Sequence, residues 1–95
     1  MDIQEWADRI MKATDKRFPD RLSLKDKVLS LTSQVGNLAE KVQVLDGTRK
    51  KDKRPNEPIQ ETAVSVLIDI LIICKMLETD FDIELSKGEK WFLEG

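Results

Sequence analysis

The side chains that could do chemistry in this 95-residue sequence lie in two apolar segments, at the spacing of a helix. The first segment is LTSQVGNLAEK, from Leu31 to Lys41, and the second is TAVSVLID, from Thr62 to Asp69. In both, hydroxyl or amide side chains recur every three or four residues, which places them on one face of each helix. An acid follows each polar series by one helical turn, at Glu40 and Asp69. Because Mg²⁺ prefers carboxylate oxygens, these two acids are candidates for a metal site.

The composition excludes several other kinds of site. The sequence has no histidine, which removes His-based triads, His general bases and most zinc sites. Its one cysteine, Cys74, lies in an apolar run and is expected in the core, without a disulfide in the chain. The net charge of −2 argues against a nucleic-acid partner. No signal-peptide pattern is visible at the first residues, so we expect a cytoplasmic protein.

Two helices are predicted before residue 47. The first runs from Asp2 to about Arg17, opened by a D-x-x-E capping pattern and ended before the Phe18–Pro19 pair. The second begins after Ser23 and closes at 46–47, Asp-Gly. Its apolar residues alternate steps of four and three, which is an a/d heptad seam. The seam consists of Leu24, Val28, Leu31, Val35, Leu38, Val42 and Leu45.

A polar linker, TRKKDKRPNE, covers residues 48–57, and two further helices are predicted after it. The basic run of the linker, from Arg49 to Arg54, could bind phosphate or be a solvated loop. Pro58 opens a third helix that is apolar around most of its circumference from Ala63 to Leu77. That stretch is too short and too polar to span a bilayer, so no membrane partner is expected. A short fourth helix follows, over residues 82–93.

These elements predict one all-α domain over residues 1–95. A chain of this size has few elements with which to enclose so apolar a third helix. Each buried Leu, Ile or Val is worth roughly 1.5–3 kcal/mol relative to exposure, which favours self-association. We therefore expect a four-helix bundle that is completed by formation of a homodimer or homotetramer.

The second and third helices resemble the MazG-like nucleoside triphosphate pyrophosphohydrolases, which are all-α bundles. The family pattern L-x-E-E-x-G-E-L-A-E is similar to LTSQVGNLAE here, and E-L-A-D-V-L-I is similar to TAVSVLI. The turn ETDFDIE and the later KGEKWF also resemble the approach to the family's last helix. The similarity runs from about Leu24 to Phe92 and rests mainly on apolar frame residues.

The resemblance implies a site whose metal ligands are missing. Family members hold Mg²⁺ with acids of these two helices and convert a nucleoside triphosphate to the monophosphate and pyrophosphate. Every matching position here carries a neutral hydrogen-bonding residue, so no metal is expected. These positions are Ser33, Gln34, Asn37, Thr62 and Ser65.

Three functions stay open at this point. The leading hypothesis is a catalytically silent homologue that binds nucleotide weakly or acts as a regulatory or assembly partner. The second is an active pyrophosphohydrolase whose Mg²⁺ ligands have moved to Glu40, Glu61 and Asp69. The third is a structural helical module unrelated to nucleotides.

Single residues give further expectations. Asp69, embedded in VLIDILII, must be paired, hydrogen-bonded or protonated, because an isolated buried charge costs several kcal/mol. We expect a buried contact to Ser65, to Thr62 or to its own copy, unless Asp69 binds a ligand. Lys87, Lys90 and Trp91 resemble the end of the family's last helix and could contact nucleotide. Trp91 could equally anchor the core or a dimer. Trp6, on the apolar side of the first helix, is expected in the core.

Overall fold

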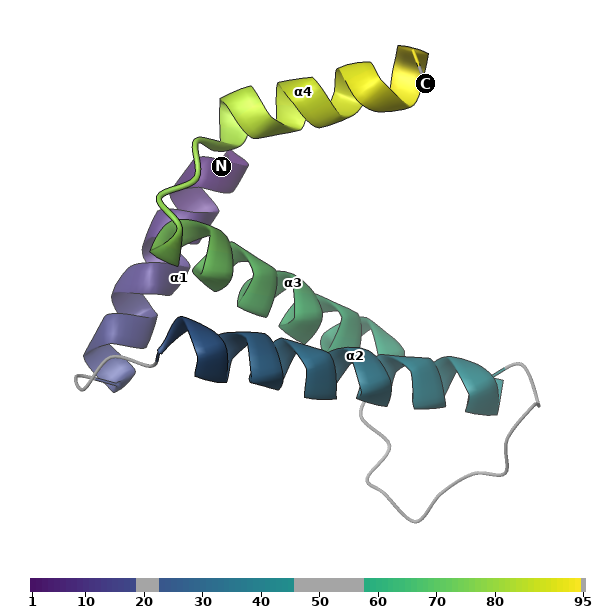
Figure 1. Cartoon of the computed structure of the whole chain (residues 1–95). Coiled ribbons are helices and arrows are strands. Elements are labelled where there is room, and N and C mark those ends of the chain that lie inside the picture. The colour runs from purple at the N-terminus through teal and green to yellow at the C-terminus, as the bar shows by residue number, and fades with distance from the viewer. Residues whose placement is uncertain (19–22, 46–57, 95) are drawn as a thin grey trace.

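The computed structural model describes residues 1–18, 23–45 and 58–94, which fold into helices (Figure 1). The helices are α1 (Ile3–Arg17), α2 (Leu24–Leu45), α3 (Ile59–Met76) and α4 (Phe81–Glu94). The described part of the chain contains no strand, so the all-α prediction is confirmed. The basic run Arg49–Arg54 lies outside the described residues.

Side chains at the helix starts account for the boundaries. Asp2 accepts a hydrogen bond from the Glu5 backbone N–H at 2.8 Å, and the Ser23 hydroxyl accepts one from the Asp26 N–H at 3.1 Å. Both contacts satisfy first-turn N–H groups that have no partner inside the helix, as the capping patterns predict. Asp80 does the same for Ile83 at 3.1 Å, a cap that the sequence prediction missed.

Helix α3 is the centre of the packing (Figure 1). Helices α2 and α3 run antiparallel, because Lys27 near the start of α2 contacts Asp69 and Lys41 near its end contacts Thr62. Helix α1 crosses the C-terminal half of α3, and the apolar core lies at that crossing. Ala7, Leu71 and Phe81 are buried there, with Ile3, Ile10 and Cys74 packed against them. The expected core position of Cys74 is confirmed.

Trp6 does not lie in that core, so its predicted position is wrong. Its side chain is 48% exposed, and the guanidinium of Arg9 lies 5.7 Å from the centre of its ring. The neighbouring Ala7 is fully buried instead. Adjacent helix residues differ by about 100° in direction, and α1 turns its small residue toward α3, which allows the two backbones to approach.

The heptad seam of α2 is divided between two surfaces. Leu31 and Leu38 are half-buried, whereas Val28, Val35 and Val42 remain 44–47% exposed. The reason is that α3 covers a neighbouring row of α2, one residue earlier in each heptad. Lys27 and Lys41 of that row contact Asp69 and Thr62, and Gln34, midway between them, is half-buried.

The turn after α3 directs α4 away from the other helices (Figure 1). The Thr79 N–H donates to the Cys74 carbonyl at 2.9 Å and the Glu78 N–H to the Lys75 carbonyl at 3.0 Å, which is the Schellman arrangement. Glu78 occupies the left-handed position, with φ of 55°. Phe81 is the buried residue of α4, and the rest of the helix lies at the surface.

In the ranges that the structure describes, no helix combines the length and the apolar character needed to cross a membrane.

Candidate functional site

A buried carboxylate lies between α2 and α3, with both of its oxygens engaged. Asp69, on α3, is 6% exposed. The Lys27 ammonium lies 2.8 Å from its Oδ1, and the Ser30 hydroxyl donates to its Oδ2 at 3.2 Å. Asp69 is therefore buried and paired, as its surroundings in the sequence predict. Its partners are two α2 side chains of the same chain, instead of the expected Ser65, Thr62 or second copy.

A second lysine reaches the same interface near the other end of α2. Lys41 donates from Nζ to the hydroxyl of Thr62 at 2.5 Å, and Thr62 is 1% exposed. Thr62 precedes Asp69 by two helical turns, or roughly 10 Å along α3. Lysine suits this geometry because its long apolar stem can pass over neighbouring side chains while the ammonium reaches a polar atom. Two ammonium groups of α2 thus meet two buried polar side chains of α3.

The five positions that match the family's metal ligands are placed unequally. Thr62 is buried, and Gln34 and Asn37 are half-buried on α2, in the stretch between Lys27 and Lys41. The Ser65 hydroxyl donates to the Glu61 carbonyl at 3.0 Å, a bond within α3 that many helical serines make. Ser33 is exposed.

The three acids of the relocated-ligand hypothesis are spread along this interface. Asp69 is level with Ser30 of α2, whereas Glu40 adjoins Lys41 near the other end. Ten residues of α2 separate Ser30 from Glu40, or about 15 Å. The hypothesis moves each ligand one turn toward the C-terminus of its helix, to Glu40 on α2 and to Asp69 on α3. Because the two helices are antiparallel, these shifts carry the two ligands in opposite directions along the interface. Glu61 is exposed, and the described residues contain no group of three or more His, Cys, Asp or Glu able to hold a metal ion.

The candidate nucleotide contacts lie on α4, away from the α2–α3 interface (Figure 1). Lys87, Lys90 and Trp91 are all exposed. The Lys87 ammonium is 3.4 Å from Glu84 Oε1, and Trp91 meets the Phe92 ring edge-to-face at 4.9 Å between centroids. Trp91 is 69% exposed and is not part of the core of its own chain.

The residues that sequence reasoning missed are the lysines and the serine that face Asp69 and Thr62. A periodic signal for the lysines was present, because Lys27, Gln34 and Lys41 repeat every seven residues, each one position before a seam valine. A lysine row beside an apolar seam is normally a solvated face. What the sequence could not show is that α3 packs on this row.

A further ion pair joins α1 to α3. The Lys75 ammonium lies 2.5 Å from Asp8 Oδ1, and Gln4 donates to the same oxygen at 3.0 Å. The hydrogen bond from Lys75, and after it the one from Gln4, lowers the pKa of Asp8 below its usual value of 3.8. The pair is partly solvated, since the Asp8 side chain is 53% exposed.

Comparison with family models, with curated proteins and with solved structures finds no match for this chain.

Proposed function

We propose that this chain is a catalytically silent MazG-like homologue in which lysine ammonium groups take the place of metal ions between α2 and α3. The observation that carries the proposal is the pairing of buried Asp69 with Lys27 and Ser30. An ammonium at 2.8 Å supplies one positive charge to the carboxylate, as a bound cation would.

This arrangement opposes magnesium chemistry for two reasons. Mg²⁺ dehydrates reluctantly and normally rests on one or two carboxylates plus the substrate phosphates. The single acid buried in the described α2–α3 interface is already neutralised, so an incoming ion would have to displace Lys27. The displaced ammonium would then lie beside the metal, and like charges at that distance repel. The alternative enzyme with Glu40, Glu61 and Asp69 as ligands would have to meet both costs.

The second part of the proposal is self-association through one side of the α2–α3 pair. Val28, Val35 and Val42 each follow a residue of α2 that faces α3. On α3, Ala63 and Ile70 follow Thr62 and Asp69, and Leu77, the C-cap residue of α3, continues the same seven-residue spacing. In each helix, the row lies one residue past a residue that faces the other helix, which turns it by about 100° around the helix axis. Because the helices are antiparallel, the two rotations bring both rows to the same side of the pair. We call this surface the outer face, and all six of its residues are exposed.

A second copy is the occupant that the outer face fits best. Two heptad-spaced rows on antiparallel helices are the surface with which helix pairs form four-helix bundles. The chain would then work as an assembly or regulatory partner, with the lysine contacts holding α2 and α3 in register.

The test of silent chemistry is pyrophosphate release from a panel of ribo- and deoxynucleoside triphosphates, with Mg²⁺ and then with Mn²⁺. The proposal predicts no release above the protein-free rate at high protein concentration. Chelator-sensitive turnover that Asp69→Asn abolishes would overturn it in favour of relocated ligands.

The same panel separates a nucleotide-binding regulator from a pure assembly module. Thermal unfolding is measured with each nucleotide in the absence of divalent metal. Stabilisation that Lys87→Ala and Lys90→Ala reduce would assign nucleotide contacts to α4. Unchanged unfolding temperatures would leave assembly as the function.

A further inference from the structure

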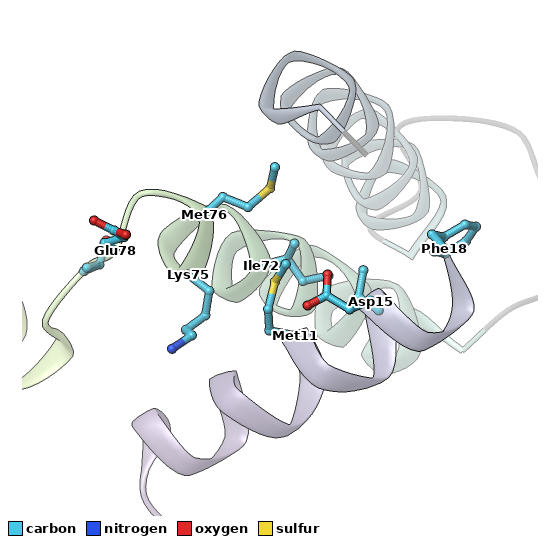
Figure 2. A pocket seen from close by; sticks show the side chains of 9 residues that line it. Met11, Asp15, Phe18, Ile72, Lys75, Met76 and Glu78 are labelled. Carbon is cyan, nitrogen blue, oxygen red and sulfur yellow. The ribbon is translucent and has the colours of Figure 1, made fainter. Parts of the chain in front are cut away.

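A groove of about 630 Å³ lies between α1 and the C-terminal half of α3 (Figure 2). Sites for small organic molecules usually have volumes of about 300–1,000 Å³, so the groove has the size of such a site. Its apolar side chains are Met11, Phe18, Ile72 and Met76. We call it the α1–α3 groove.

The apolar lining suits an aromatic group. Met11 and Met76 come from the two facing helices, and methionine is flexible and makes favourable contacts between its sulfur and aromatic rings. Phe18, at the end of α1, is 45% exposed and supplies a ring against which a second ring can pack. Ile72 is buried beneath this surface. A flat apolar group that enters the groove would therefore contact two thioethers and one ring.

Acids and hydroxyl groups make up most of the polar lining. Asp15 of α1 and Glu78 of the turn after α3 contribute carboxylates, and neither carboxylate has a hydrogen-bond or ion-pair partner among the described residues. The Thr14 hydroxyl donates its proton to the Ile10 carbonyl at 2.8 Å, which leaves the hydroxyl oxygen as an acceptor. The polar part of the groove therefore consists mainly of hydrogen-bond acceptors.

The lysine of the lining does not neutralise these acids. The Lys75 ammonium is ion-paired with Asp8, and Figure 2 shows the Lys75 side chain extending away from Asp15. Asp8 precedes Asp15 by two helical turns, or roughly 10 Å along α1. Arg17 lies outside the lining, with its guanidinium 5.7 Å from the centre of the Phe18 ring. The groove itself therefore keeps an excess of negative charge.

We propose that the α1–α3 groove binds a small organic cation in which a short alkyl chain joins an aromatic ring to an ammonium group. The ring lies on the apolar lining, and the ammonium lies at Asp15, whose carboxylate is beside Met11 and Ile72 in Figure 2. An ammonium donates hydrogen bonds and accepts none, so it matches a lining of acceptors. Glu78 adds a second negative charge from the other helix.

Other occupants fit this lining less well. A metal ion would leave the apolar side chains unused, and the described residues offer no group of three or more His, Cys, Asp or Glu to hold it. An anion would meet the unpaired carboxylates of Asp15 and Glu78. Helix α4 of a second copy would do the same, because Glu84 and Glu89 flank its apolar row.

The test uses the full chain with ¹³C-labelled methionine methyl groups. Of the three methionines, Met11 and Met76 line the groove, and Met1 lies outside it as an internal control. The probes are three indoles of similar size. At neutral pH, tryptamine carries an ammonium, tryptophol a hydroxyl and indole-3-propionate a carboxylate.

Tryptamine should shift the Met11 and Met76 signals saturably, with a dissociation constant of about 1 mM or lower, and leave Met1 unchanged. Tryptophol should bind at least about fivefold more weakly, because it lacks the charge, and indole-3-propionate more weakly still. Equal affinities of the three indoles would overturn the proposal. So would the absence of a saturable shift at Met11 and Met76 with tryptamine.

A variant links the effect of charge to one residue. Asp15→Asn should raise the dissociation constant of tryptamine about threefold and leave that of tryptophol unchanged, which also shows that the groove is still folded. Glu89→Gln is the matched control, because it removes an exposed acid outside the lining and should change neither constant. An equal effect of the two variants, or no effect of Asp15→Asn, would contradict the proposed position of the ammonium.

The same spectra distinguish this site from self-association. If the Met11 and Met76 signals move with protein concentration when no indole is present, a second copy occupies the groove and the proposal is overturned. Release of pyrophosphate concerns the α2–α3 interface, where neither Asp69 nor Thr62 lines the groove, so the proposed function and this site can fail separately.

Discussion

At the scale of single residues, the distinctive feature is a buried acid held by an ammonium and a hydroxyl. The side chains of Lys27 and Asp69 are 12% and 9% exposed, so both charges are largely removed from water. Removing one partner of such a pair lowers the free energy of unfolding by more than the intact pair contributes to it, because a buried charge is left without a partner. The lysine is therefore a structural requirement of the α2–α3 interface once Asp69 is present.

The pairing predicts a strong coupling between the two residues. Lys27→Met should destabilise the chain by about 3 kcal/mol. Adding Asp69→Leu to that variant should recover much of the lost stability, because the double variant buries no charge without a partner. Urea unfolding of the two single variants and the double variant measures the coupling. Lys87→Ala is the control, because its pair with Glu84 is solvated and should change stability by less than about 0.5 kcal/mol. Additive effects at Lys27 and Asp69 would refute the coupling.

Asp8 provides a prediction about pH. Lys75 and Gln4 lower the pKa of Asp8 in the folded chain, so the unfolded chain binds this proton more readily. The stability from this contact is present above the unfolded pKa and is lost as pH falls through the lower folded value. Carboxyl chemical shifts followed by NMR should show Asp8 titrating below its usual range. In Lys75→Met the pKa should move back up, and no movement would exclude Lys75 as the cause.

At the scale of elements, the sequence predicts each helix but not which faces meet. Capping patterns at Asp2 and Ser23 and the proline at 58 predict where three of the helices begin. Periodicity could not tell that α3 covers the lysine row of α2 and leaves the seam valines exposed, because both rows repeat every seven residues. The partners of Asp69 were missed for the same reason: they depend on the antiparallel register, which no local pattern encodes.

The turn between α3 and α4 gives a prediction at this scale. Glu78 has φ of 55°, a conformation that costs an L-residue roughly 1–2 kcal/mol and that glycine adopts freely. Glu78→Gly should therefore stabilise the chain by up to about 1 kcal/mol, after the greater freedom of glycine in the unfolded chain is subtracted. Glu89→Gly, the same change inside α4, should destabilise it by about 1 kcal/mol. Urea unfolding distinguishes them, and a loss of stability in both would contradict the role assigned to the turn.

At the scale of the whole molecule, the described chain has a small core and large uncovered apolar surfaces. Ala7, Leu71, Ile72 and Phe81 are the buried apolar residues of the described ranges, while exposed apolar rows run along α2, α3 and α4. A chain of this size gains only modest stability from its own core. Association of copies would cover the outer face, which is why folding and assembly are expected to be coupled.

Assembly through the outer face predicts a matched pair of results. Val35→Glu places a charge in the middle of that face and should weaken self-association at least about tenfold, because the charge would have to be desolvated. Leu29→Glu is the control: Leu29 is 58% exposed, but it lies outside the Val28–Val35–Val42 row. Sedimentation equilibrium gives the dissociation constants. Equal weakening by both changes would argue against a specific outer face.

We propose that ammonium groups, and not a metal ion, neutralise the site between α2 and α3. The most direct test is Mn²⁺ added to the ¹⁵N-labelled full chain, with paramagnetic broadening followed at each backbone amide and Mg²⁺ as the diamagnetic reference. If Lys27 neutralises Asp69, the amides of Ser30 and Asp69 should broaden no more than those beside solvated acids such as Glu84. Selective broadening around Asp69 at low Mn²⁺, reversed by Mg²⁺, would show a metal site there and overturn the proposal.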